Sequence, residues 1–160
     1  MTRTTLLALA ERVEAARVSD RTGLRNEVAL ATGWHRVEPR FTKSKHGAWI
    51  KPCDFIGVHS DGSPKLDSLH GTDMHREPPN FLESLDAAMS LVPSGWSVGI
   101  GHLPGVDWLI RAHLRDHRPQ SLTPAGHSHI YVEGHNKDFA LALTAACLRA
   151  RAIAWSMTDD

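Results

Sequence analysis

The sequence predicts an α+β fold, in which a small and mainly antiparallel sheet of three or four strands packs with four helices. Two observations support this prediction: apolar residues recur at helical spacing in four segments, and three strand-like segments separated by turn residues lie in the second half of the chain. A chain of 160 residues has the usual length of one domain. We therefore expect a single domain over residues 1–160, with an irregular, insertion-like region at about 35–79.

The first two helices are predicted near the N-terminus. The opening helix carries an apolar stripe with charged residues opposite; the stripe comprises Leu6, Leu9, Val13 and Ala16. Ser19 or Asp20 can cap the second helix, and Gly33 stands where a left-handed residue favours its end. A short third helix is expected over Ser84–Val92, with inward-facing residues Leu85, Ala88, Met89 and Val92.

The closing helix, from about Asn136 to Trp155, has the strongest pattern in the sequence. Asn136 can cap it, and Arg149 and Arg151 lie toward its C-terminal end, where the helix dipole favours cations. Two apolar stripes adjoin along it: Phe139, Leu143, Ala146, Ala150 and Ile153, and Leu141, Ala145, Leu148 and Ala152. So broad an apolar arc must be buried against the sheet, and a homodimer would follow if the second stripe were left uncovered.

Three strands are expected between the last two helices: Trp96–His102, Val106–His113 and His127–Glu133. The Leu103–Gly105 linker is short enough for a hairpin, so we predict an antiparallel meander. Ala48–Ile50 is a candidate edge strand of the same sheet.

Composition limits the classes of partner. Lysine plus arginine equals aspartate plus glutamate at 18 each, so the net charge gives no overall attraction to nucleic acid or anionic lipid, although a local basic patch could supply one. The sequence lacks an apolar stretch of transmembrane length, and its first residues do not resemble a signal peptide. We expect a cytoplasmic protein in a bacterial host cell, without a membrane partner.

Two cysteines do not indicate a disulfide framework. Cys147 lies on the apolar face of the closing helix and is expected to be a small core residue. Cys53 precedes Asp54, whose negative charge would raise the pKa of the thiol.

Four sequence blocks resemble a family of small phage and prophage proteins, the phage α/β/α (ABA) sandwich domain proteins. These blocks are LLALAERVEAA at Leu6–Ala16, the segment Arg21–Trp34 ending in ALATGW, PPNFLESLDAAMSLVPSGW at Pro78–Trp96, and ALALTAACLRARA at Ala140–Ala152. The resemblance implies a mobile-element origin and an α/β/α sandwich-like fold. It implies no catalytic residues.

Histidines offer the first candidate site. His127 and His129 are two positions apart on a predicted strand and so share a face, and His113 ends the preceding strand. Together they could bind zinc or manganese. The pair resembles the His-Ser-His pattern of JAMM peptidases, but Ile130 replaces the proline that should follow, and no serine stands between His129 and Asp138.

A basic run offers the second candidate site. Between His35 and Lys51 five cations oppose one anion, Glu38. Its cations and the two interleaved aromatic residues could hold phosphates, stack a base or bind a protein surface; the residues are Arg36, Arg40, Phe41, Lys43, Lys45, Trp49 and Lys51. A solvated loop is the alternative interpretation.

The sequence leaves three functional hypotheses. The first is a non-enzymatic phage or prophage accessory protein that binds a host protein, as anti-CRISPR inhibitors do, or sequesters a nucleotide signal. The second is a metal-dependent hydrolase centred on His127 and His129. The third is a virion or assembly component.

Overall fold

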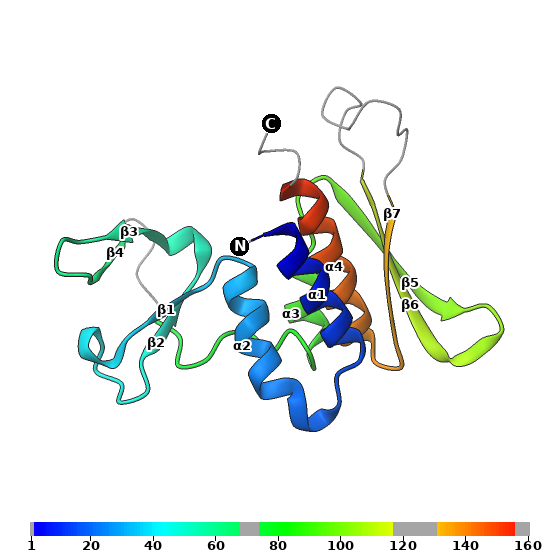
Figure 1. Ribbon diagram of the computed structural model, residues 1–160, viewed down its shortest axis with the longest axis horizontal. Helices are drawn as coiled ribbons and strands as arrows, with labels where there is room; N and C mark the ends of the chain where they lie inside the picture. The colour runs from blue at the N-terminus through cyan, green and yellow to red at the C-terminus, as the bar shows by residue number, and fades with distance from the viewer. Residues whose placement is uncertain (1, 68–73, 117–130, 156–160) are drawn as a thin grey trace. The chain divides into compact units, whose positions relative to one another are not determined.

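The computed structural model describes residues 2–67, 74–116 and 131–155 (Figure 1). The chain divides into two compact units, which we describe separately: unit 1 is Met1–Leu24 with Asn80–Asp160, and unit 2 is Arg25–Pro79. Four α-helices and small antiparallel sheets in the described residues confirm the predicted α+β class. None of the helices in these ranges has the length and apolar character needed to cross a membrane.

Unit 1 holds the three-stranded sheet and most of the helical structure. Its elements are α1 (Arg3–Glu14), η1 (Val18–Asp20), α3 (Leu85–Met89), β5 (Trp96–Leu103), β6 (Val106–Asp116), β7 (Tyr131–Asn136) and α4 (Phe139–Trp155). Helix α2 (Arg21–Ala31) begins in unit 1 and continues in unit 2.

The sheet of unit 1 is the predicted antiparallel meander, with strand order β5-β6-β7. Ile100 of β5 stands opposite Ala112 of β6, and Leu114 of β6 stands opposite Val132 of β7. Strand β7 begins at Tyr131 in the described chain, so the predicted positions 127–130 lie outside the described residues.

Helix α4 forms the centre of the unit 1 core. It lies against β6 and β7, and α1 packs beside it (Figure 1). Every side chain from Ala140 to Leu148 is buried, so the second predicted stripe is covered within the chain and offers no free face for the homodimer we considered. Phe139 was expected in the first stripe, but it is 43% exposed because it begins the helix, ahead of the buried turns.

Gly134 allows the sheet to approach α4 closely. A Cβ atom at this position of β7 would lie 2.0 Å from the carbonyl oxygen of Ala142 and 2.8 Å from the amide nitrogen of Ala146. Both are backbone atoms of α4, which cannot move aside as a flexible side chain would. The contact between strand and helix therefore requires glycine.

Helix α4 begins at Phe139, three residues after the predicted start at about Asn136. Asp138 accepts a hydrogen bond from the amide of Ala140 at 3.0 Å, and Asn136 accepts one from the amide of Asp138 at 2.9 Å. Asp138 thus supplies the side-chain oxygen at the first turn, while Asn136 is the last residue of β7. The expectation that Asn136 directly caps the helix is wrong, because the chain turns for two residues before the helix begins.

Helix α3 is shorter than predicted. Ser84 caps it by accepting a hydrogen bond from the amide of Ala87 at 3.3 Å. Ala88 is buried as expected, but Leu85 and Met89 are 41% and 40% exposed. The inward face is instead set by Ala88 and by Leu91, which is buried just beyond the five-residue helix.

Unit 2 contains short strands and tight turns over much of the region predicted to be irregular. After α2, its elements are β1 (His35–Val37), η2 (Pro39–Phe41), β2 (Ala48–Ile50), η3 (Pro52–Asp54), β3 (Phe55–Val58) and β4 (Pro64–Leu66). They form two antiparallel pairs, β1-β2 and β3-β4. Gly33 follows α2 with a φ of +92°, as predicted for a left-handed helix end.

The predicted role of Ala48–Ile50 as an edge of the meander is wrong. This segment is β2, and it pairs with β1 so that Arg36 stands opposite Trp49. Gly47 makes the hairpin possible, because its φ is +79° and a Cβ there would lie 2.3 Å from the carbonyl oxygen of Val37. Local pairing across this turn therefore prevails over pairing with distant strands.

The strand pairs of unit 2 contribute one small cluster to its core. Its buried members are Val37, Ala48 and Ile50, and the partly buried residues packed against them are Phe41, Phe55 and Leu66. All come from the two strand pairs and the intervening η2 turn.

Candidate functional site

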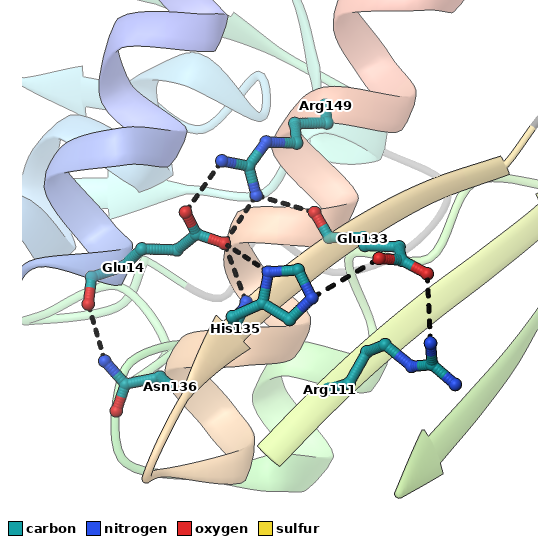
Figure 2. Close-up of polar contacts among 6 residues, drawn as sticks. All are labelled: Glu14, Arg111, Glu133, His135, Asn136 and Arg149. Atoms are coloured by element: carbon teal, nitrogen blue, oxygen red, sulfur yellow. Dashed lines mark hydrogen bonds and ion pairs between the residues drawn. The ribbon is translucent and has the colours of Figure 1, made fainter. Parts of the chain in front are cut away.

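A bidentate ion pair joins the end of α1 to the middle of α4. The Nη1 and Nη2 atoms of Arg149 lie 2.6 Å and 2.7 Å from Oε1 and Oε2 of Glu14 (Figure 2). Nη1 of Arg149 also donates to the carbonyl oxygen of Glu133 in β7, at 2.6 Å. The side chains of Arg149 and Glu14 are only 23% and 21% exposed, so this pair is largely withdrawn from water.

Strand β7 adds further contacts to Glu14. The backbone amide of His135 donates to Oε1 of Glu14 at 2.7 Å, and Nδ2 of Asn136 donates to the carbonyl oxygen of Glu14 at 2.6 Å. The His135 ring lies between two carboxylates, with Nε2 3.3 Å from Oε2 of Glu133 and Nδ1 3.9 Å from Oε1 of Glu14 (Figure 2).

Arg111 of β6 completes this arrangement, since its Nη1 lies 3.6 Å from Oε1 of Glu133. We call the six residues of Figure 2 the Glu14 network: Glu14, Arg111, Glu133, His135, Asn136 and Arg149. The network links α1, α4 and two strands of the sheet.

The surroundings of Glu14 favour its charged form. Burial alone would raise the pKa of this carboxyl, but the hydrogen bond from Arg149, the amide of His135 and the positive charge of Arg149 together lower it. The hydrogen bond to Glu14 in turn raises the pKa of Arg149. Because its oxygens are already held by these donors, Glu14 is suited to fixing helix and strand rather than to accepting a proton from a substrate.

Sequence reasoning missed this network. Glu14 had the appearance of a charged residue on the outer face of an amphipathic helix, and Arg149 of a cation near a helix end. A usable signal existed: Arg149 stands four residues after Ala145, in line with an otherwise apolar row of α4. A lone cation in such a row must be paired.

Four of the five predicted basic residues of unit 2 are exposed. Arg36, Lys43 and Lys45 are exposed, and Lys51 is half-buried. Arg40 is exposed as well; its Nε lies 2.8 Å from Oε2 of Glu38, and its guanidinium stacks 4.5 Å from the centre of the Phe41 ring. We use the name basic face for the four exposed cations of this segment as a set: Arg36, Arg40, Lys43 and Lys45.

Trp49 does not belong to this face. Its side chain is only 6% exposed, and its backbone pairs with His75 through bonds of 2.7 Å and 2.8 Å. It is therefore a packing residue of unit 2, and a role in stacking an external base, which the sequence suggested, is wrong for this side chain.

A hollow of about 210 Å³ lies in unit 2, and Arg36 of the basic face belongs to its lining. Its lining comes from β1, η2, β3, β4 and the connections between them: His35, Arg36, Val37, Glu38, Phe41, Phe55, Val58, Gly62 and Pro64. Phe55 stacks on His35 with ring centres 3.5 Å apart and an interplanar angle of 22°. Burial lowers the pKa of His35, so its neutral form is favoured.

The predicted metal site falls mostly outside the described residues. This is true of His127 and His129, and for His113 the structure describes the backbone, which places it opposite Gly99 and Glu133 in the sheet. In the described ranges, no three or more histidine, cysteine or acidic side chains are grouped as a metal site would require. Binding of zinc or manganese stays a prediction.

The two thiols have the surroundings that the sequence indicated. Cys147 is buried, and burial raises its pKa to about 12. Cys53 is exposed, and its Sγ donates to Oδ1 of Asp54 at 3.3 Å, which raises the pKa of the thiol. Both features argue against a nucleophilic role.

The fold and contacts thus define an α+β protein with a tightly bonded unit 1 and a small unit 2 that presents a basic face and a hollow. Comparison with family models, curated proteins and solved structures found no match to this chain.

Proposed function

We propose that this chain is a phage- or prophage-encoded accessory protein that acts by binding a host component through the basic face of unit 2. The biological outcome we infer is inhibition of a host defence system, either by masking a protein surface or by retaining a nucleotide signal. The phage origin rests on the resemblance of the four sequence blocks. The binding role rests on the chemistry of unit 2.

The exposed basic face is the observation that supports this proposal. Five cations oppose one anion between His35 and Lys51, and the four members of the face are exposed. Ile56 and Val58 of β3, in the same unit, are 55% and 66% exposed. Exposed apolar side chains and arginines both occur frequently in contact surfaces, and the cations favour an acidic partner.

Affinity capture from a bacterial host lysate tests the proposal. The immobilised chain is compared with the double variant Lys43→Glu/Lys45→Glu, and the retained proteins and nucleotides are identified by mass spectrometry. Arg3→Glu/Lys137→Glu is the matched control, because it changes net charge equally at two exposed positions of unit 1. Circular dichroism checks that all three proteins are folded.

We expect a component that is retained by the wild-type chain and by the unit 1 control, and lost with the unit 2 variant. Phosphate- or carboxylate-directed contacts should also weaken as salt concentration rises. Capture of nothing, or equal retention by both double variants, would contradict a binding role for the basic face.

A further inference from the structure

The hollow in unit 2 has the dimensions of a site for one ring system. Its volume of about 210 Å³ is smaller than the roughly 300–1,000 Å³ of sites for drug-sized molecules. Residues of both strand pairs line it, including Val37 of β1 and Val58 of β3. A single ring system is therefore small enough to occupy the hollow.

Aromatic rings give this hollow the lining that planar ligands require. Three of its residues carry rings, namely His35, Phe41 and Phe55. The stack of His35 on Phe55 and the guanidinium of Arg40 above Phe41 give each of these three rings a contact partner. Rings held in this way can contact a ligand ring without losing further conformational freedom.

The polar groups of the hollow suit a base and a phosphate. His35, whose pKa burial lowers, presents one donor and one acceptor in its neutral form, which matches the mixed donor and acceptor edge of a nucleobase. Arg36 lines the hollow and, within the described part of the chain, has no side-chain partner. Arg40 lies at the edge, since its Nη2 is 3.8 Å from a Cβ placed on Gly62.

We propose that this hollow binds the base of a nucleotide, with the phosphate held by Arg36 at its rim and by Arg40 beside it. This inference rests on the proposed binding function and selects the nucleotide from its two partner classes. Arg40 is shared with Glu38, so Arg36 is the main phosphate ligand.

Four probes separate the contributions of base and phosphate. They are adenosine 5′-monophosphate, cytidine 5′-monophosphate, adenosine and ribose 5-phosphate, and each is titrated into the full chain by isothermal calorimetry. We expect saturable binding of both nucleotides at one site per chain. Adenosine and ribose 5-phosphate should each bind at least about tenfold more weakly, because each lacks one half of the contacts.

Variants assign the two halves to residues. Arg36→Met should weaken binding of adenosine monophosphate about tenfold and leave adenosine unaffected, since it removes the phosphate contact from an exposed side chain. Phe41→Leu should weaken both ligands. Lys65→Met, an exposed cation of β4 outside the lining, is the control and should behave as wild type.

Three results would overturn the inference: no saturable binding of any probe, equal nucleotide affinity in Arg36→Met and Lys65→Met, or ribose 5-phosphate binding as tightly as the nucleotides. If Phe41→Leu does not fold, the comparison of Arg36→Met with Lys65→Met is sufficient to test the inference. If lysate capture retains a protein through the basic face while nucleotides fail to bind, the nucleotide site is refuted and the proposed function stands.

Discussion

The two units of the chain organise their charged and apolar side chains in different ways. Unit 1 buries every residue of α4 from Ala140 to Leu148 and holds its helices with the Glu14 network. The strand pairs of unit 2 bury a cluster of three residues, and the side chains of its Glu38–Arg40 pair are each 65% exposed. An ion pair as exposed as that one contributes little to stability.

This difference suggests that unit 1 is the structural scaffold and that unit 2 carries the contact surface. In unit 1, the partly buried charges of Arg149 and Glu14 bind each other through a bidentate contact. Unit 2 leaves Arg36, Lys43 and Lys45 exposed. We therefore expect substitutions in unit 1 to act on stability and substitutions on the basic face to act on binding.

The largest effect is expected at Gly134. Gly134→Ala places a Cβ against the backbone of α4, so β7 and α4 must separate, at a cost of about 3 kcal/mol or more. Thermal unfolding followed by circular dichroism should show a melting temperature lower by roughly 10 °C.

Gly101→Ala is the matched control, because a Cβ at this position of β5 meets no atom within 4 Å. Its melting temperature should stay close to that of the wild type. Similar melting temperatures for the two variants would mean that β7 does not approach α4 as closely as described.

A smaller effect is expected from the Glu14–Arg149 pair. Arg149→Met leaves Glu14 charged and partly buried, so the free energy of unfolding should fall by about 2 kcal/mol. Arg40→Met in unit 2 should cost less than about 0.5 kcal/mol. Chemical denaturation with the double-mutant cycles Glu14→Gln/Arg149→Met and Glu38→Gln/Arg40→Met measures both coupling energies.

The same pair predicts how stability depends on pH. The pKa of Glu14 is lower in the folded chain than in the unfolded one, so its stabilisation is complete above its ordinary pKa and is lost as pH falls through the folded value. The stability advantage of wild type over Glu14→Gln should thus vanish in acid. An advantage that is constant with pH, or coupling equal to that of Glu38 and Arg40, would contradict the network.

The sequence alone predicted those features that depend on the residue pattern within a single helix or strand. The burial of α4 and the order of the meander followed from apolar spacing, which reports local geometry. The left-handed Gly33 followed from its place after a helix.

Features that depend on distant residues could not be predicted in this way. The partner of Arg149 is 135 positions away, and nothing in the local pattern names it. The pairing of Ala48–Ile50 with β1 requires Gly47 to approach the carbonyl oxygen of Val37, ten positions earlier. Trp49 stands among cations, which suggests base stacking, but its burial and its backbone pairing with His75 involve residues outside that run. For the candidate site, the sequence located the basic residues, but the hollow arises from rings brought together by two strand pairs.

The smallest expected effect distinguishes the two units through their thiols. At pH 8, iodoacetamide should label Cys53 slowly and leave Cys147 unlabelled in the folded chain, since burial raises the pKa of Cys147 to about 12. Asp54→Asn removes the charge that accepts the hydrogen bond of Cys53, which lowers the pKa of that thiol and should raise its labelling rate several-fold. Mass spectrometry of peptides follows each site, and Cys147 serves as the internal control.

An unchanged labelling rate of Cys53 would show that Asp54 does not control the reactivity of this thiol. Faster labelling of Cys147 in the same variant would show that unit 1 also responds to a substitution in unit 2, which the separation into scaffold and contact surface does not allow.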